Sequence, residues 1–405
     1  MRAAHNLMLC VDDLKVRARS RLPRFVYDFV EGGAEDERCY ARNLADLAAL
    51  QLVPHCLRDT TAVDTGAQVF GQAWRMPVGI APVGLAGLIR PGADLMLARA
   101  AAAEGVPFVL STASNERIES VRAAAPNGML WMQLYVMSDR AIAEQIVRRA
   151  RIENYAALVL TVDVPVNGYR QRDLRNGFKL PFRLGAGMLA DMVAHPSWTL
   201  AMARGGQPHF VNLSEDARSP ASAQAQAGLL ARAMDRRLTW DAIAWLRRLW
   251  TGPLLVKGVL HPDDALLAIT HGVDGLLVSN HGGRQLDVAP SSIAALRRIL
   301  VAVEDRIPVI VDSGFRRGSD VAKAIAMGAR AVLVGRAALW GVAAAGESGA
   351  RLALQMLHSE LERTMILLGC GSMDDLVQAH VLQAGGTPRG APDSGLSAVD
   401  QSPCM

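Results

Sequence analysis

The segment from Ser279 to Asp287, with the sequence SNHGGRQLD, holds a histidine and an arginine separated by two glycines. Glycines let the chain turn sharply, so His281 and Arg284 are expected to face the same space. An imidazole beside a guanidinium suits an anionic substrate that must lose a proton to a general base. Asp163 follows another apolar run, and its carboxylate is expected to orient the imidazole of His281 and stabilise its protonated form. The alternative, a structural core histidine, is disfavoured by the flanking Gly-Gly-Arg.

Two further turns combine glycine with arginine. The sequence DSGFRRG runs from Asp312 to Gly318, and the dipeptide Gly335-Arg336 follows the next apolar run. Glycines allow backbone N–H groups to approach an anion, and arginines add charge-assisted hydrogen bonds. The pair predicts a phosphate site at the ends of two neighbouring strands; ordinary turns with surface arginines are the alternative.

Polar side chains also stand where other apolar runs end. Any one of them alone would be an ordinary loop residue, but a purely structural fold does not need a carboxylate, a lysine and a histidine at successive strand ends. The set therefore indicates a site built from the ends of several parallel strands. Its members are Ser111, Gln133, Tyr135, Thr161, Asp163, Lys257, Ser279, Asn280, His281, Asp312, Gly335 and Arg336.

The elements that must carry these residues are short runs rich in Val, Ile and Leu, separated by helical patterns. Such runs are typical of strands covered on both faces. Their strict alternation with helices predicts the α/β class, and their number favours closure into a (β/α)8 TIM barrel. An open doubly wound sheet is the alternative, but the Gly-x-Gly-x-x-Gly turn that it would normally carry after an early strand is missing. The expected strands are 77–81, 107–111, 130–135, 157–161, 254–257, 275–279, 308–311 and 331–334, and the expected helices include 94–104, 139–151, 263–271 and 319–327, several beginning with an Asp or Ser that can cap the first turn.

The length of 405 residues fits one barrel with additions. We expect a single domain over residues 1–384, with the barrel at about 76–345, and a disordered tail rich in Gly, Pro and Ser over 385–405. The first 75 residues are expected to form an N-terminal helical cap with a small β element. An insertion at about 182–237 follows the fourth strand, and its Ala/Ser/Gln-rich part, 214–228, is predicted to be mobile.

Composition excludes several classes of protein. The net charge of +4 is spread thinly along the chain, which argues against a nucleic-acid-binding protein. Five cysteines without a Cys-x-x-Cys pair argue against a disulfide framework or a zinc site and favour a reducing compartment. The sequence has no export signal, and no run approaches the ~20 apolar residues that a transmembrane helix needs. We therefore expect a cytoplasmic protein without a metal.

Together these motifs resemble the FMN-dependent α-hydroxy acid dehydrogenase/oxidase family, which includes glycolate oxidases, L-lactate dehydrogenases and mandelate dehydrogenases. The resemblance rests mainly on residues 279–287 and covers residues from about 10 to 375. It implies a flavoprotein enzyme that binds FMN. The other matching motifs are YDFVEGGA at 27–34, LSTAS at 110–114, QLY at 133–135, TVD at 161–163, Lys257-Gly258 and DSGFRRG at 312–318.

The resemblance also implies a role for each matching residue. The implied catalytic residues are His281, Asp163, Tyr135 and Lys257, with Lys257 beside the flavin N1–C2=O edge. The implied substrate-binding residues, which would clamp a carboxylate, are Tyr27, Arg170 and Arg284. The implied FMN-binding residues are Pro82, Val83, Gly84, Ser111, Gln133, Thr161, Lys257, Ser279, Asp312, Gly314, Arg316, Gly335 and Arg336.

The tripeptide Pro82-Val83-Gly84 departs from the Pro-Thr-Ala or Pro-Thr-Gly that is usual in the family. A valine has no hydroxyl, so any contact of Val83 with the flavin must come from its backbone. Pro-Val-Gly looks like the L-lactate dehydrogenases, and the small Gly84 favours a dehydrogenase over an oxidase that uses O₂.

The implied reaction is oxidation of an (S)-2-hydroxy acid to the 2-oxo acid. Residues 166–179 look most like mandelate dehydrogenases, and the small Ala113 leaves room for an aromatic substituent, so a mandelate-like substrate is preferred. An L-lactate dehydrogenase and an O₂-using oxidase are the alternatives. An FMN-dependent isomerase or a non-catalytic flavoprotein would not need Arg170, Arg284 and His281 in this arrangement.

The insertion has two interpretations that the sequence leaves open. In mandelate and lactate dehydrogenases, the equivalent of residues 182–213 is linked to membrane association and to electron transfer to quinone. Here the run that holds Met188, Met192, Trp198 and Met202 has one charged residue, Asp191, and it suits a membrane surface as well as an apolar lid or an oligomer contact. The resemblance also implies a homotetramer, and membrane docking would make the protein peripheral on the cytoplasmic face of the inner membrane.

Overall fold

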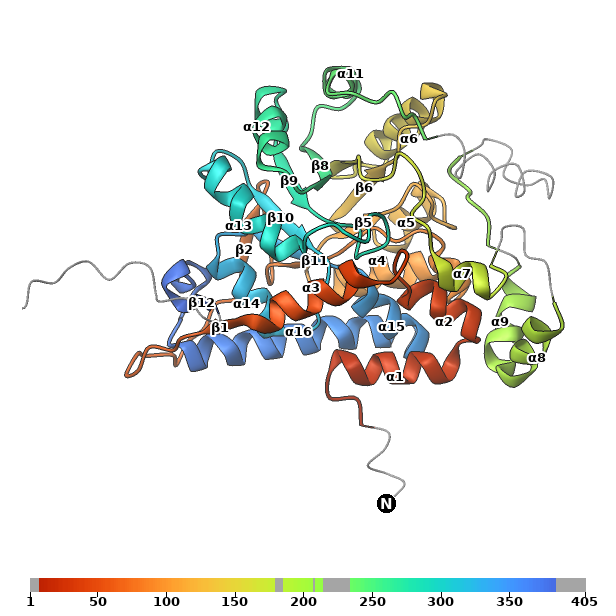
Figure 1. Cartoon of the computed structure of the whole chain (residues 1–405), viewed down its shortest axis with the longest axis horizontal. Helices are drawn as coiled ribbons and strands as arrows, with labels where there is room; N and C mark the ends of the chain where they lie inside the picture. The colour runs from red at the N-terminus through yellow and green to blue at the C-terminus, as the bar shows by residue number, and fades with distance from the viewer. Residues whose placement is uncertain (1–6, 179–184, 207, 214–233, 384–405) are drawn as a thin grey trace, which may run out of the picture.

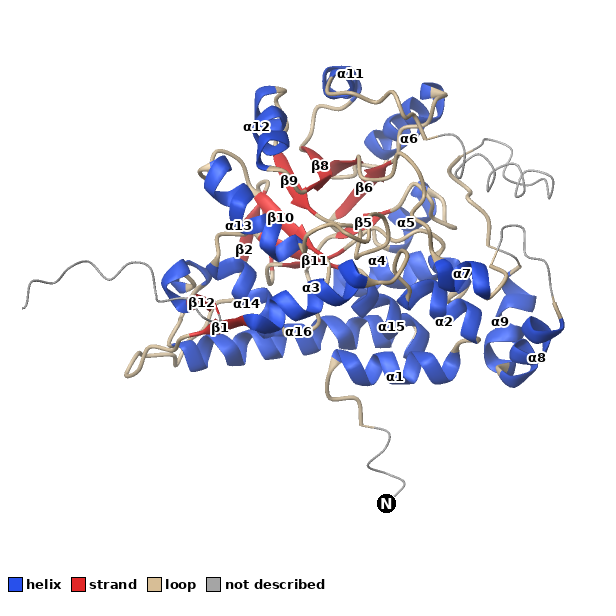
Figure 2. Ribbon diagram, viewed as in Figure 1, coloured by secondary structure: helices blue, strands red, loops and turns tan. Residues whose placement is uncertain are grey.

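The computed structural model describes residues 7–178, 185–206, 208–213 and 234–383 (Figure 1). Parallel strands close into a barrel in the order β10-β11-β4-β5-β6-β7-β8-β9, and Figure 2 shows them at the centre with helices around them. The predicted (β/α)8 barrel is confirmed. The barrel strands are β4 (Val78–Ile80), β5 (Phe108–Leu110), β6 (Leu130–Leu134), β7 (Ala157–Thr161), β8 (Leu254–Val259), β9 (Gly275–Val278), β10 (Val309–Asp312) and β11 (Ala331–Val334). The predicted tail at 385–405 and the predicted mobile part at 214–228 lie outside the described residues.

Every barrel strand agrees with its predicted range to within two residues. The largest difference is in β8, which continues past Lys257 to Val259 through an irregular register. Gly258 has a φ of +106°, and a Cβ on it would lie 2.6 Å from the Cβ of Asp163. Only glycine therefore lets Asp163 lie this close to the end of β8.

The helices that surround the barrel follow the predicted alternation. Asp139 caps its helix as expected, since its side chain accepts a hydrogen bond from the backbone N–H of Ala141. Asp94 is different: it lies inside the first turn, is fully buried, and accepts a hydrogen bond from Ser114 at 2.7 Å. The helices are α4 (Ala93–Ala103), α5 (Ile118–Ala124), α6 (Arg140–Ile152), α11 (Asp241–Leu249), α12 (Pro262–Thr270), α13 (Ser292–Val303), α14 (Gly318–Ala326), α15 (Arg336–Ala345) and α16 (Glu347–Leu368).

A β-hairpin from the N-terminal region closes the bottom of the barrel. Its strands, β2 (Ala67–Val69) and β3 (Gln72–Trp74), pair antiparallel. The Trp74 ring lies 5.5 Å from that of Trp131 in the barrel interior, and the Trp131 Nε1 donates to the side-chain oxygen of Gln72 at 3.1 Å. This hairpin is the predicted β element, and it leaves the C-terminal end of the barrel for chemistry.

The N-terminal helices cover the opposite end and one side. They are α1 (Val11–Arg21), α2 (Arg24–Glu31) and α3 (Arg38–Ala49), and Figure 1 shows α1 beside α15. The turn after α2 is joined to the barrel mouth, because the backbone N–H of Ala34 donates to the carbonyl of Gly283 at 2.8 Å. A second small sheet pairs β1 (Leu50–Leu52) with β12 (Val381–Gln383).

The described part of the insertion forms α8 (Ala186–Ala194) and α9 (Pro196–Gly205), preceded by the short α7 (Gln171–Arg175). Figure 1 shows α8 and α9 at one edge of the molecule, beside α2. The side chain of Asp191 accepts from the backbone N–H of Arg24 at 2.6 Å, and the Trp198 ring packs edge-on against Phe25. Within the described ranges, every helix falls short of the length and apolar character that a membrane crossing requires.

Candidate active site

A cavity of about 710 Å³ opens at the C-terminal ends of the strands. Its wall combines residues of α2 and α3, the loops after the barrel strands, and both described flanks of the insertion. The predicted site residues that line it are Pro82, Val83, Gly84, Ser111, Tyr135, Arg170, Lys257, His281, Arg284, Asp312, Gly314, Arg316, Gly335 and Arg336. The predicted residues Gln133, Asp163, Thr161 and Ser279 lie directly behind this wall, and Tyr27 lies elsewhere.

His281 and Asp163 form a hydrogen-bonded pair at the cavity. The imidazole Nδ1 lies 3.0 Å from Oδ1 and 3.2 Å from Oδ2 of Asp163. His281 has a φ of +57°, and Gly282 and Gly283 also have positive φ, so the turn predicted for this segment is present. Because an ionised carboxylate only accepts hydrogen bonds, Nδ1 carries the proton and Nε2 keeps its lone pair.

The electrostatics favour a neutral His281 beside an ionised Asp163. Burial lowers the pKa of His281, and the charges of Lys257 and Arg170 act in the same direction, against the opposing effect of Asp163. Burial alone would raise the pKa of Asp163, but the charges of His281 and Lys257 outweigh it, so this pKa lies below its ordinary value. The pair is thus prepared to accept a proton at Nε2.

Lys257 is a buried ammonium group, only 3% exposed, at the end of β8. Its Nζ donates to the hydroxyl of Ser279 at 2.8 Å and lies 3.5 Å from Asp312 and 3.9 Å from Asp163. Two carboxylates therefore offset the charge of this buried ammonium group.

Gln133 and Thr161 support the loop beside the cavity. The side-chain amide of Gln133 donates to the Thr161 hydroxyl at 3.0 Å, and its oxygen accepts from Ser111 and from the backbone of Thr112. The Ser111 hydroxyl in turn accepts from the backbone N–H of Ala113 at 3.1 Å. This network fixes two side chains, Ser111 and Ala113, that face the cavity.

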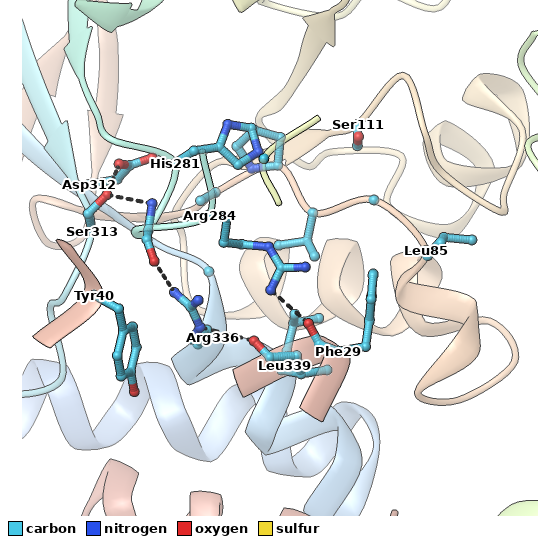
Figure 3. Close-up of a pocket in the computed structure, with 18 of the residues that line it drawn as sticks. Phe29, Tyr40, Leu85, Ser111, His281, Arg284, Asp312, Ser313, Arg336 and Leu339 are labelled. Carbon is cyan, nitrogen blue, oxygen red and sulfur yellow. Dashed lines mark hydrogen bonds between the residues drawn. The ribbon is translucent and has the colours of Figure 1, made fainter. Parts of the chain in front are cut away.

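Two partly buried arginines, Arg170 and Arg284, face the same cavity. Arg284 donates from one Nη to the carbonyls of Phe29 and Gly32 at 2.7 and 2.9 Å, as Figure 3 shows for Phe29. The Nε of Arg170 is buried without a hydrogen-bond partner among the described residues. Burial lowers the pKa of both groups, and for Arg284 the nearby charge of Arg170 lowers it further. Two close, desolvated guanidinium groups make this part of the cavity suited to an anion.

The structure corrects the prediction for Tyr27. Residues two apart on a helix point about 200° from each other, so Tyr27 and Phe29 cannot face the same side of α2. Tyr27 packs in the hydrophobic core, with the Arg19 guanidinium 5.9 Å from its ring. Phe29 lines the cavity instead, stacked on Phe178 at 4.8 Å.

The other end of the cavity holds Arg316 and Arg336. The guanidinium of Arg316 bonds the hydroxyl of Tyr40 and lies 5.1 Å from the Trp340 ring. All three nitrogens of the Arg336 guanidinium donate to backbone carbonyls, those of Val30, Gly32 and Gly282, at 2.9 to 3.0 Å. Figure 3 shows this guanidinium between Tyr40 and the end of α2. Its side chain therefore fastens the cap to the barrel, a role that the sequence did not predict.

Comparison with known proteins decides the family. The sequence model described as "FMN-dependent dehydrogenase" matches residues 18–383. This chain belongs to the FMN-dependent dehydrogenase family. It is 45% identical to the (S)-mandelate dehydrogenase of Pseudomonas putida over 377 residues, covering 93% of this chain and 94% of that protein. It is 43% identical to the L-lactate dehydrogenase of Caulobacter vibrioides over 358 residues, covering 88% and 93%.

Solved structures of this family have the same fold. The crystal structure described as monotopic membrane protein (S)-mandelate dehydrogenase superposes with a TM-score of 0.89 at 44% identity, covering 93% of this chain and 99% of that one. The crystal structure of mandelate oxidase gives a TM-score of 0.79 at 35% identity, with the same coverage. The predicted family, enzyme class and FMN dependence are confirmed.

The residues of this FMN-dependent dehydrogenase fit the cofactor. Gly84 and Ala113 both line the cavity, and a Cβ on Gly84 would lie only 2.9 Å from the Cβ of Ala113. Glycine therefore leaves space here that a larger residue would fill. Lys257 supplies a buried cation, and Arg316 and the first turn of α15 supply a cation and backbone N–H groups suited to a phosphate. Val83 lines the cavity without a hydroxyl, as the sequence indicates.

Several residues at the cavity were not predicted as site residues. Asp173 follows the motif arginine Arg170, and its buried carboxyl has a raised pKa because burial outweighs the charges of Arg284 and Arg170. The helical period of α2 shows that only one of Tyr27 and Phe29 can face the cavity, but not which one. The lining residues that were not predicted include Phe29, Tyr40, Asn43, Leu174, Phe178, Phe210, Met234 and Trp340.

Proposed function

We propose that this FMN-dependent dehydrogenase oxidises an (S)-2-hydroxy acid with a bulky, mandelate-like substituent to the 2-oxo acid. The observation that carries the proposal is His281, held by Asp163 at 3.0 Å, at a cavity that is also lined by Arg170 and Arg284. An L-lactate dehydrogenase and an O₂-using oxidase are the alternatives within the same chemistry.

In the proposed mechanism, Arg170 and Arg284 bind the substrate carboxylate and thereby fix the hydroxyl-bearing carbon at the cavity wall. His281 takes a proton from the substrate at Nε2, and Asp163 stabilises the imidazolium that forms. Tyr135, whose pKa is raised by burial and by the charge of Asp163, keeps its hydroxyl proton and donates to the reacting centre. FMN, when bound, supplies the two-electron acceptor.

Lys257 is proposed to contribute a fixed positive charge where negative charge builds up during the reaction. Ser111, Gln133, Thr161 and Ser279 are proposed to contact the ring or ribityl chain, directly or through the loop that they hold. Pro82, Val83 and Gly84 would border the ring. The ribityl and phosphate groups are assigned to Asp312, Gly314, Arg316, Gly335 and the backbone of Arg336.

A colour test examines the proposed reaction. The purified protein should be yellow, and anaerobic addition of (S)-mandelate should bleach the flavin absorbance, with a higher kcat/KM than L-lactate. The small Ala113 and the stacked pair of Phe29 and Phe178 support the preference for an aromatic substituent. A yellow protein that no 2-hydroxy acid bleaches would contradict the proposed function. A higher kcat/KM for L-lactate than for (S)-mandelate would instead favour an L-lactate dehydrogenase.

The pH dependence of flavin reduction tests the state of His281. Only the neutral imidazole is a base, and its pKa lies below the ordinary value of 6.5. We therefore expect kcat/KM to keep its neutral-pH value down to below pH 6.5 and to fall only at more acidic pH. Lys257→Met should move this acidic limb to higher pH, because the charge of Lys257 lowers the pKa of His281. Anaerobic stopped-flow absorbance gives the profile, and a limb centred above pH 6.5 in the parent protein would contradict the assignment.

We also propose that α8 and α9 dock on the cytoplasmic face of the inner membrane, so that electrons pass to a quinone. The related (S)-mandelate dehydrogenase is described as a monotopic membrane protein. Here Leu189, Val193 and Leu200 are exposed on these helices, Val193 to 79%, while their single carboxylate, Asp191, is turned to the backbone of Arg24. Exposed apolar side chains on a weakly charged surface favour interfacial binding.

Flotation with phospholipid vesicles tests the docking surface. The parent protein should float with the vesicles, and replacing both Leu189 and Val193 by serine should leave it at the bottom of the gradient. Val301→Ser is the matched control, since Val301 is 74% exposed but lies on α13, outside the insertion. Equal flotation of the double variant and the control would favour a lid or an oligomer contact. Analytical ultracentrifugation of the same proteins without vesicles gives their mass in solution and so tests the predicted homotetramer.

A further inference from the structure

The insertion returns to the barrel through residues 208–213 and supplies part of the cavity wall. The Phe210 side chain lines the cavity and is only 4% exposed. Met234, at the other described flank of the insertion, also lines the cavity and forms a β-bridge with Met137. Two described segments of the insertion, residues 208–213 and the segment at Met234, therefore line the same cavity as the barrel loops.

Two asparagines join this segment to the barrel on either side of Phe210. The Nδ2 of Asn115 donates to the carbonyl of His209 at 2.9 Å, while its oxygen accepts from the backbone of Gly87. The Nδ2 of Asn212 donates to the carbonyl of Glu116 at 2.8 Å.

Asn212 is fully buried and also accepts two hydrogen bonds. Its oxygen accepts from the backbone N–H of Ile118 at 3.2 Å and from Arg149 at 3.0 Å. Arg149 is itself held by a two-point pair with Glu119 at 2.7 and 2.8 Å. Hydrogen bonds to a buried side chain such as Asn212 hold a segment in one position.

The position of Phe210 identifies the part of a ligand that it meets. Asn115 belongs to the loop after β5 that also carries Ser111 and Ala113, and Figure 3 shows Ser111 across the cavity from Tyr40, which binds Arg316 at the cationic end. Arg170 and Arg284 attract the carboxylate of the substrate, so its substituent must lie against an apolar part of the wall. Apolar residues of the wall outside the glycine and arginine turns include Phe29, Ala113, Val164, Leu174, Phe178, Phe210 and Met234.

We propose that Phe210 is a specificity-determining residue that selects an aromatic over a methyl substituent on the substrate, and that Asn212 and Asn115 are positioning residues that hold it there. The proposal rests on the proposed function for the orientation of the substrate. Aromatic rings pack well on one another and on apolar walls, whereas a methyl group is too small to reach the ring of Phe210. The insertion thus contributes to substrate selection as well as to any contact with a surface.

Binding of carboxylates that cannot be oxidised tests the proposal without turnover. Phenylacetate and acetate lack the hydroxyl group, and their binding to the FMN-loaded full chain is read from the perturbation of flavin absorbance. Phe210→Ala should raise the Kd of phenylacetate about tenfold and leave that of acetate within about twofold. Phe210→Leu should give a smaller change in the same direction, because it keeps apolar volume without the flat ring. Leu200→Ala, an exposed position of α9 in the same insertion, is the control and should change neither.

Activity gives the second readout. Phe210→Ala should lower kcat/KM for (S)-mandelate about tenfold, mainly through KM, with that for L-lactate within about twofold. Equal losses for both substrates, or no loss for either, would overturn the specificity role. If no 2-hydroxy acid bleaches the flavin at all, the proposed function fails, but the comparison of phenylacetate with acetate still decides the role of Phe210.

A double-mutant cycle tests the positioning role of Asn212. Asn212→Ala should raise the KM for (S)-mandelate while kcat is retained, and combining it with Phe210→Ala should cause no greater loss than Phe210→Ala alone. The same cycle with Asn115→Ala tests the second contact. Effects that add fully, or an Asn212→Ala loss that is equal for (S)-mandelate and L-lactate, would mean that the asparagine stabilises the fold without acting through Phe210.

Discussion

His281→Asn should leave a yellow protein whose flavin a 2-hydroxy acid no longer bleaches at a normal rate. Asparagine has no group that takes a proton near neutral pH, so removal of the base should lower the rate constant of flavin reduction by a factor of roughly 10² to 10⁴. Asparagine also tolerates a left-handed backbone, and His281 has a φ of +57°. The loss should therefore be catalytic, with FMN binding retained; His281→Ala should give the same loss with some added backbone strain.

Anaerobic stopped-flow absorbance measures the rate, and the ratio of flavin to protein absorbance measures FMN content. His261→Asn is the matched control, because His261 is exposed at the start of α12 and asparagine can take over its capping hydrogen bond. Bleaching of His281→Asn at a rate close to that of the control would remove His281 as the base. Loss of FMN from the variant would show instead that the turn at 281–283 mainly supports the cofactor.

The second large effect is expected at Arg170. Its Nε is buried without a hydrogen-bond partner among the described residues, which leaves the guanidinium free for a substrate carboxylate. Hydrogen bonds to charged groups contribute about 1.5–3 kcal/mol, so Arg170→Met should raise KM roughly 10- to 150-fold. Arg170→Lys keeps the charge but not the two-point geometry, so its KM should lie between that of the parent protein and that of Arg170→Met.

Steady-state kinetics and the Kd of a non-oxidisable carboxylate separate binding from chemistry. Arg175→Met is the matched control, since Arg175 is exposed on α7, five residues further along the same segment. Arg284→Met should combine the loss of substrate binding with lower stability, because Arg284 also holds the carbonyls of Phe29 and Gly32. An unchanged KM and Kd in Arg170→Met would contradict the carboxylate clamp.

The barrel and the acid–base pair were accessible from sequence because both depend on short-range patterns. Apolar runs of the length of a strand alternate with helices along the chain, and parallel strands in a closed barrel bring their C-terminal ends together. Polar residues at those ends, such as Asp163 and His281, must therefore meet. Their hydrogen bond at 3.0 Å agrees with that expectation.

The errors arose where the direction of a side chain depends on packing. Tyr27 and Phe29 belong to the same motif, and only the docking of α2 on the barrel decides that Phe29 faces the cavity. The motif predicted a place at the cavity for Arg336, but not the three backbone carbonyls of the cap and the barrel to which its guanidinium donates. A sequence motif identifies the residue type but not the partner that tertiary structure offers to it.

By itself, the sequence determined the (β/α)8 fold and the strand ends that carry the polar residues, since strand periodicity and turn residues act over a few positions. The flavin-dependent chemistry followed from the resemblance of its motifs to a known family. The tertiary structure decided which side chains close the site. Phe210 comes from the far side of the insertion and stands in no motif, and Phe29 stands in a motif of the cap that does not say which of its side chains faces the cavity. Their place follows from long-range packing and from buried hydrogen bonds such as those of Arg284 and Asn212, which join segments far apart in the chain.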